Sequence, residues 1–138
     1  GLIPALRALV SDFQEWSGLP ARFDGPAALP PMPAEAELAL FRAVQEGLSN
    51  VARHAQARAV TVTLACEEGI VRLAVEDDGA GLPAGELARV SGGPGRSGLF
   101  GMRERLASQG GEVRLAARNG GGLRLEVSLP MTDRGGEE

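Results

Sequence analysis

The chain has no lysine, one histidine, one cysteine and few aromatic residues, which make up 4% of its 138 residues. The single cysteine, Cys66, excludes an intramolecular disulfide framework and a cysteine-rich zinc site. Because aromatic side chains are scarce, the core has to be built mainly from Leu, Val and Ala. No apolar run approaches the ~18 residues of a membrane span, and the first residues lack a signal-peptide pattern. We therefore expect one cytoplasmic domain of the α/β or α+β class.

The net charge of −4 argues against a surface devoted to nucleic-acid binding. We expect no nucleic-acid partner and no direct membrane contact by this domain. The chain starts abruptly inside a helical pattern, so we expect a piece of a longer parent protein, for which a membrane anchor stays open.

Apolar spacing predicts two helices in the first part of the chain. Residues 2–16 carry the i, i+3, i+4 spacing of an amphipathic helix, and Gly18 supplies a stop. After a short extended piece at 21–24, the Pro-rich stretch 25–33 can continue neither a helix nor a central strand. A long helix is predicted over 34–55. The predicted apolar faces are Leu2, Leu6, Leu9, Val10, Phe13 and Trp16 in the first helix, and Leu38, Phe41, Val44, Leu48, Val51 and Ala55 in the second.

Strict alternation predicts two β-hairpins. Residues 59–66 and 70–77 flank a turn at 67–69, while 112–117 and 123–130 flank the turn "RNGGG". Between the hairpins lie a glycine-rich, mostly irregular loop at 77–98 and a third helix with Leu99, Met102 and Leu106 on one face. This layout predicts a two-layer α/β (α+β) sandwich over residues 1–130. Residues 131–138 are predicted to form a disordered tail.

The polar face of the long helix carries Glu46, Asn50, Arg53 and His54 within an arc of about 100°. A solvated stripe is one interpretation of this face. Asn50 in a helix interior and Gly47 beside it both lower helix propensity, which a merely solvated face does not need. Carboxylate and amide oxygens suit Mg²⁺, and the cations suit phosphate. No second His, Cys or HExxH spacing supports zinc at His54.

Two glycine-rich segments add candidate ligand contacts. In "EDDGAGLP", Asp77 ends a strand, and Gly79 and Gly81 allow close backbone approach to a ligand. The Asp77 carboxylate can accept a hydrogen bond from an amino group such as adenine N6, although a plain Asp-Gly turn stays open.

In "GRSGLFGMRER", glycines stand before and inside the first turn of a helix. This arrangement suits an anion, unless the segment is only a linker and an N-cap. It is not a Walker P-loop, whose lysine is absent, nor a Rossmann fingerprint.

In this order, the segments resemble the ATP-binding catalytic domain of two-component sensor histidine kinases, which has the Bergerat (GHKL) fold. "FRAVQEGLSNVARHA" resembles the N box, "VEDDGAGL" the first glycine box and "SGLFGMRERL" the second, over roughly residues 34–130. "NVARHA" with "GLFGMRER" resembles the subgroup paired with helix-turn-helix response regulators. The resemblance implies a mixed, mostly antiparallel sheet with about three helices on one face.

The resemblance also implies roles for single residues. Asn50 would coordinate Mg²⁺, with Glu46 beside it as a second catalytic residue. Asp77 would bind the adenine amino group of ATP in a pocket shaped by Gly79 and Gly81. Arg53 and His54 would contact the phosphates, and Gly98 and Gly101 would bring the lid and the helix start to them. Ser97 and Leu99 would also belong to the nucleotide-binding residues.

Three positions depart from the family pattern. Leu123 stands where a threonine is usual, which implies a lower affinity for ATP. Gly47 stands where alanine is commoner, which could loosen the helix. Ser97 replaces a residue that is often glycine or histidine, so the hinge of the lid, residues 83–97, could differ.

The family's phosphoacceptor histidine lies on a separate dimerisation domain, which this chain does not show, so we expect ATP binding without autophosphorylation. The implied partners are that domain of the same dimeric parent and a response regulator. Two alternatives stay open. One is a standalone serine kinase of the anti-sigma-factor kind, and the other is a degenerate interaction module without nucleotide.

Overall fold

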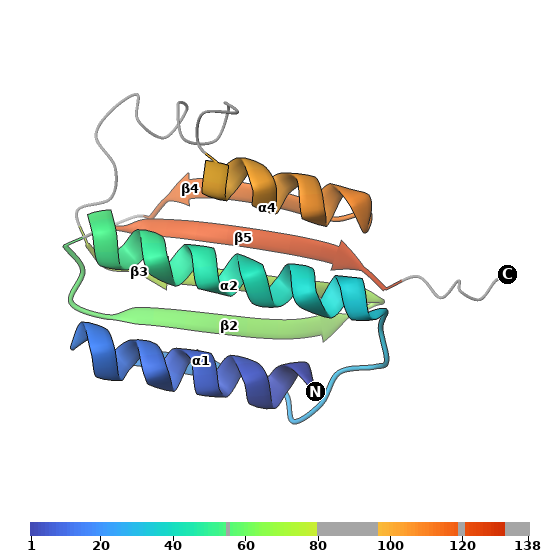
Figure 1. Cartoon of the computed structure of the whole chain (residues 1–138), viewed down its shortest axis with the longest axis horizontal. Helices are drawn as coiled ribbons and strands as arrows, with labels where there is room; N and C mark the ends of the chain where they lie inside the picture. Colours follow the sequence, from blue (N-terminus) through green and yellow to red (C-terminus); the bar gives the residue numbers. More distant parts are fainter. Residues whose placement is uncertain (55, 80–96, 119–120, 132–138) are drawn as a thin grey trace, which may run out of the picture.

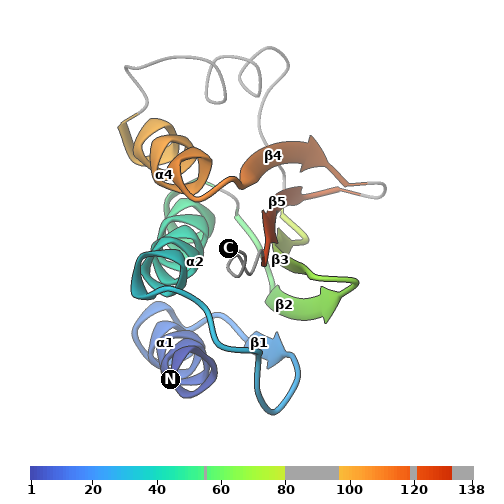
Figure 2. The same ribbon diagram turned by 90° about the vertical axis from the view of Figure 1, so that its right-hand side faces the viewer.

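A computed structural model of the chain describes residues 1–54, 56–79, 97–118 and 121–131, with the side chains of 54 and 97–99 outside the description. The helices α1 (Leu2–Ser17), α2 (Ala34–His54) and α4 (Ser97–Ser108) lie side by side, roughly along the longest axis of the molecule (Figure 1). Figure 2 shows all three on one face of the sheet. The predicted two-layer sandwich is confirmed.

The sheet has five strands in the order β1-β2-β3-β5-β4. The strands are β1 (Ala21–Asp24), β2 (Val60–Glu67), β3 (Ile70–Asp77), β4 (Glu112–Ala117) and β5 (Leu123–Pro130). β1 pairs with β2 in parallel, and the other three pairs are antiparallel. The predicted mixed, mostly antiparallel sheet is thus confirmed, and the extended piece at 21–24 proves to be one of its two edge strands. Both hairpins arise from alternating residues, whose apolar half points to the helices.

The first helix ends as predicted, but one of its apolar residues is not in the core. Gly18 adopts φ 78°, and its N–H donates to the Gln14 carbonyl. Trp16 is 66% exposed, although it packs edge-on against Phe13 with ring centroids 5.0 Å apart. At 100° per residue, Trp16 lies about 90° from the centre of the buried stripe, which explains its exposure.

The predicted apolar face of α2 needs a larger correction. Leu38 is 49% exposed, whereas the helix buries a face that contains Ala36, Leu40, Ala43 and Gly47. A Cβ on Gly47 would meet side-chain atoms of the sheet residues Val75 and Leu125 at 3.1 Å. Gly47 therefore lets the helix lie close to the sheet, and its place in the helix has a packing reason.

Because α2 is rotated about its axis relative to the predicted orientation, its polar residues also lie elsewhere than predicted. Glu46 and Asn50 are half-buried at the border of the buried face, not opposite it as predicted. Counted at 100° per residue, Asn50 lies only about 60° from the buried centre near Gly47. A half-buried amide and carboxylate at this border are better placed for a ligand than a fully solvated stripe would be.

Candidate functional site

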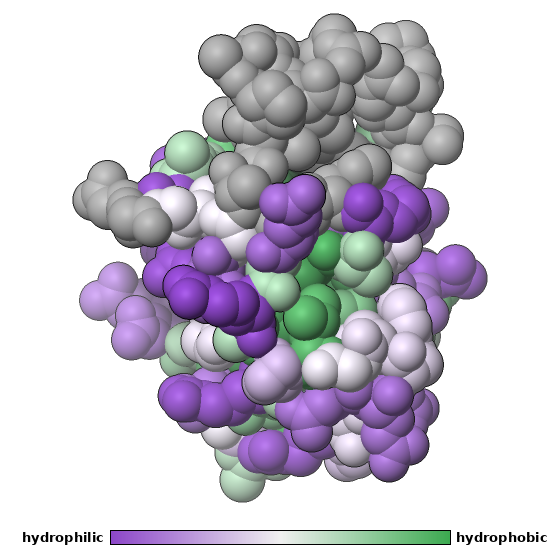
Figure 3. Space-filling model, turned by 90° about the vertical axis from the view of Figure 1, so that its left-hand side faces the viewer, coloured by the Kyte–Doolittle hydropathy of each residue, from purple (hydrophilic) through white to green (hydrophobic). Residues whose placement is uncertain are grey.

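Three segments that the sequence singled out lie at one end of the molecule, together with the β4–β5 turn. The end of α2, the end of β3, the start of α4 and the β4–β5 turn all lie there (Figure 1). The antiparallel register explains part of this, since Asp77 at the end of β3 faces Val60 at the start of β2. Figure 3 looks onto this end and shows an apolar area in its middle, framed by hydrophilic side chains.

The structure brings Glu46, Asn50 and Arg53 together on α2. The Arg53 guanidinium donates to Asn50 Oδ1 at 2.8 Å and lies 3.8 Å from the Glu46 carboxylate. It also donates to Ser49 Oγ at 2.8 Å. Sequence reasoning missed Ser49, although the i, i+4 spacing to Arg53 could have indicated it. His54 is the last residue of α2, and its side chain lies outside the described part of the chain.

Asp77 is the one buried charged or polar side chain among the described residues, at 3% exposure. Burial raises the pKa of its carboxyl group above the ordinary 3.8, against the opposing effect of the Gly79 and Leu123 N–H groups. The Gly79 N–H donates to Asp77 Oδ1 at 2.8 Å. Burying an ionised carboxylate is costly unless hydrogen-bond donors compensate it, and the Gly79 N–H is one such donor in this structure.

The turn between β4 and β5 closes on Asp77 from the other side. The Arg118 guanidinium donates to the Asp77 backbone carbonyl at 2.7 Å. Gly122 has φ 103°, and a Cβ there would stand 1.9 Å from the same carbonyl oxygen. Sequence reasoning treated "RNGGG" as a simple turn and missed both contacts, for which the run of glycines was the available signal.

The second glycine box forms the first turn of α4. Ser97, Gly98 and Leu99 open the helix, whose first turn contains no acidic residue. Their backbone N–H groups belong to the positive end of the helix, as predicted. Around Gly101, the nearest atoms to an added Cβ are on the Arg105 guanidinium at 3.5 Å or more, so packing does not require glycine there. Gly81 and residues 83–96 of the predicted lid lie outside the described residues.

A family comparison decides the class of this chain. The family described as "Histidine kinase-, DNA gyrase B-, and HSP90-like ATPase" matches residues 35–133. The chain belongs to this ATPase family. The matched region contains the site segments of α2, β3, α4 and the β4–β5 turn.

Individual relatives agree with the family. The histidine kinase-like ATPase domain is 35% identical over 131 residues to the signal transduction histidine-protein kinase/phosphatase UhpB of Salmonella typhimurium, covering 94% of this chain and 25% of that protein. The nitrate/nitrite sensor protein NarX of Escherichia coli is 33% identical, covering 94% of this chain and 21% of that protein. The chain thus spans a quarter or less of these two relatives.

The fold has solved counterparts. The histidine kinase domain of the blue-light activated histidine kinase from Erythrobacter litoralis EL346 superimposes with a TM-score of 0.80, at 22% identity, over 96% of this chain and 62% of that one. At this identity the similarity concerns the fold. It confirms the Bergerat-type arrangement expected for the ATPase family.

The donor set at the end of α2 fits a magnesium ion that is shared with a ligand. Asn50 Oδ1, the Glu46 carboxylate and Ser49 Oγ are oxygen ligands of the kind a hard cation prefers. No cluster of three or more His, Cys, Asp or Glu side chains suited to a metal occurs in the described ranges. A metal here would therefore depend on phosphate oxygens and water for its other ligands, as Mg²⁺ commonly does at nucleotide sites.

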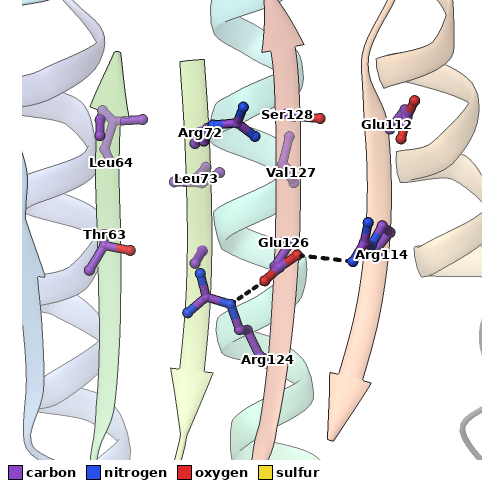
Figure 4. Close-up of a pocket in the computed structure, with 12 residues that line it drawn as sticks. Thr63, Leu64, Arg72, Leu73, Glu112, Arg114, Arg124, Glu126, Val127 and Ser128 are labelled. Atoms are coloured by element: carbon purple, nitrogen blue, oxygen red, sulfur yellow. Dashed lines mark hydrogen bonds and ion pairs between the residues drawn. The ribbon is translucent and has the colours of Figure 1, made fainter. Parts of the chain in front are cut away.

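A separate hollow of about 290 Å³ lies on the open face of the sheet, away from the helices (Figure 4). Its charges are largely matched: Arg124 pairs with Glu76 and Glu126, and Arg114 lies 3.9 Å from Glu126. Partly exposed ion pairs of this kind contribute little to the stability of the fold. No helix in the described part of the chain is long and apolar enough to cross a membrane.

Proposed function

We propose that this chain is the ATP-binding kinase domain of a bacterial two-component sensor histidine kinase. It binds Mg-ATP and donates the γ-phosphate to a histidine on a separate dimerisation domain, from which a response regulator receives it. The observation that carries this proposal is the buried Asp77 carboxylate, at the same end of an ATPase-family fold as the half-buried Asn50 and Glu46.

Asp77 is the adenine-recognising residue in this proposal. Its carboxylate accepts a hydrogen bond from the adenine amino group, which guanine cannot offer at the same place. The low solvent exposure of Asp77 strengthens this discrimination, because a ligand without the matching donor leaves part of a desolvated carboxylate without a hydrogen bond. In this proposal Gly79 and Gly81 would shape the pocket for the base.

The end of α2 and the start of α4 serve the triphosphate. Asn50 holds Mg²⁺, which supplies charge neutralisation at the phosphates when bound. Arg53 and His54 bind phosphate oxygens, and the N–H groups of Ser97, Gly98 and Leu99 add the positive end of α4. Glu46 orients the reacting group beside Asn50. The guanidinium of Arg53 donates to Asn50 Oδ1 in this structure, so Arg53 would exchange this contact for phosphate if Asn50 were to hold the metal.

The test is a calorimetric titration of the chain with a non-hydrolysable ATP analogue and Mg²⁺, run beside the GTP analogue. We expect saturable binding of the adenine nucleotide and at least about tenfold weaker binding of the guanine nucleotide. Absence of heat at millimolar ligand would exclude the kinase proposal and favour the degenerate interaction module. A standalone serine kinase would also bind ATP, and transfer to a serine of a partner protein would distinguish it.

Asn50→Ala should remove most of the magnesium dependence of nucleotide binding. We expect the gain in ATP-analogue affinity on adding Mg²⁺ to fall about tenfold, because the protein oxygen ligand is lost while the adenine contact remains. Titrations with and without Mg²⁺ measure this gain directly. Gln45→Ala is the matched control, since Gln45 is exposed on the same helix. An unchanged magnesium dependence in Asn50→Ala would show that Asn50 is not the ligand.

A further inference from the structure

The loop that follows α2 is held by a carboxylate to which the proposed chemistry gives no role. Asp78 Oδ1 accepts the N–H of Arg58 at 2.8 Å and that of Ala59 at 3.0 Å. The next N–H along the chain, that of Val60, donates to the Pro20 carbonyl at 3.0 Å. Three consecutive backbone donors are thus tied to the end of β3 and to the start of β1.

The position of Asp78 explains why a side chain is needed there. Val60 and Asp77 form the last pair of the β2–β3 ladder, so residues 58 and 59 have left the strand. The loop comes off α2 through Gln56, which has the positive φ of 50°. The Asp78 carboxylate continues the connection where the backbone ladder ends. Its hydrogen bonds to these two amides also hold the pKa of Asp78 below the ordinary value.

We propose that Asp78 is a positioning residue that fixes the phosphate end of α2 relative to Asp77. This role rests on the proposed function, because α2 ends in Asn50, Arg53 and His54, while Asp77 immediately precedes Asp78. The adjacent carboxylates then have different roles: Asp77 binds the base, and Asp78 connects the adenine side of the site to the phosphate side at the end of α2. This role requires no contact between Asp78 and the nucleotide.

The amide contacts carry this role, and the nearby ion pair does not. Arg58 Nε lies 3.9 Å from Asp78 Oδ2, but the Arg58 side chain is 88% exposed, so this pair is weak. One oxygen that accepts two amides requires the reach of aspartate or asparagine. Glutamate keeps the charge but displaces the carboxylate by one methylene.

The test compares Asp78→Ala and Asp78→Asn with the wild type and with Asp24→Ala as control. Asp24 is an exposed residue of β1 whose carboxylate pairs with Arg22. Amide hydrogen exchange is measured at Arg58 and Ala59 in the free protein. Calorimetry then measures the affinities for the Mg-bound ATP analogue and for adenosine.

In Asp78→Ala we expect about tenfold faster exchange at both amides and about tenfold weaker binding of the Mg-bound ATP analogue. Adenosine affinity should change by less than about threefold, because the adenine contact is kept. Asp78→Asn should restore most of the protection and affinity, since its Oδ1 still accepts both amides. Asp24→Ala should match the wild type.

Three results would overturn the inference. The first is unchanged ATP-analogue affinity in Asp78→Ala, and the second is an equal loss for adenosine and the ATP analogue. If Asp78→Ala does not fold, the same exchange and affinity measurements are made on Asp78→Glu. The third overturning result is that Asp78→Glu behaves like the wild type. If the wild type itself bound no Mg-ATP analogue, the proposed function would fail together with this role. Failure of the positioning role alone leaves wild-type binding intact.

Discussion

Asp77→Asn should abolish adenine-selective nucleotide binding while leaving the fold as stable as before or more so. The amide oxygen of the introduced asparagine can still accept the Gly79 N–H, which lies 2.8 Å from Asp77 Oδ1. The other position then presents an NH₂ donor where adenine also presents a donor. Loss of a charged acceptor costs about 1.5–3 kcal/mol. We therefore expect about a hundredfold weaker binding of the ATP analogue in calorimetry.

The stability of the same variant follows from the sign of the pKa shift. Because burial raises the Asp77 pKa above 3.8, the Asp77 carboxyl group of the folded protein stays protonated up to a higher pH than that of the unfolded chain. Stability therefore falls as the pH rises from 3.8 through the folded-state pKa, and this penalty persists at neutral pH. Asp77→Asn removes this fall. Urea unfolding at several pH values should show equal or higher stability of the variant at about pH 7.

Asp24→Asn is the matched control for this prediction. Asp24 undergoes the same chemical change at an exposed site on β1, where its partner is Arg22. We expect unchanged nucleotide affinity and a stability change within about 0.5 kcal/mol. If Asp77→Asn loses binding only because it unfolds, its urea midpoint will fall, and the adenine-recognition role loses its support. If it keeps full ATP-analogue affinity, that role is excluded.

Regular elements were predictable because their patterns are local. The alternation of 112–117 and 123–130 places both strands of the last hairpin at their observed bounds. Gly18 likewise ends the first helix through its own conformation. The errors at Trp16 and Leu38 have a different origin. A helical stripe indicates which residues are apolar, but the neighbours that cover it depend on how the helix is rotated against the sheet.

The candidate site divides in the same way. Glu46, Asn50 and Arg53 could be grouped from the sequence because helix geometry fixes their spacing, and Asp77 because it ends a strand. Ser49 was missed despite that spacing. Asp78, Arg118 and Gly122 acquire their roles through partners far along the chain, such as the Arg118 bond to the Asp77 carbonyl. Only the folded arrangement shows that Gly122 must lack a side chain.

Gly122→Ala should disrupt both stability and the nucleotide site. Its φ of 103° is strained for any residue with a Cβ, and that Cβ would stand 1.9 Å from the Asp77 carbonyl oxygen. The backbone of the turn or of Asp77 must move, which breaks the close packing around the Arg118 hydrogen bond. We expect a loss of about 3 kcal/mol or more in the free energy of unfolding, measured in urea, together with weaker ATP-analogue binding.

Gly69→Ala separates the clash from backbone strain. Gly69 also has a positive φ, 76°, but an added Cβ there meets nothing within 4 Å. It lies in the β2–β3 turn between strands that end at Glu67 and begin at Ile70. Gly69→Ala should therefore lose only about 1 kcal/mol and keep wild-type nucleotide affinity. If the two variants lose the same free energy of unfolding, backbone strain alone explains the loss in Gly122→Ala, and the clash with the Asp77 carbonyl contributes nothing to it. A larger loss in Gly122→Ala, with weakened nucleotide binding, would show that the β4–β5 turn holds Asp77 in place.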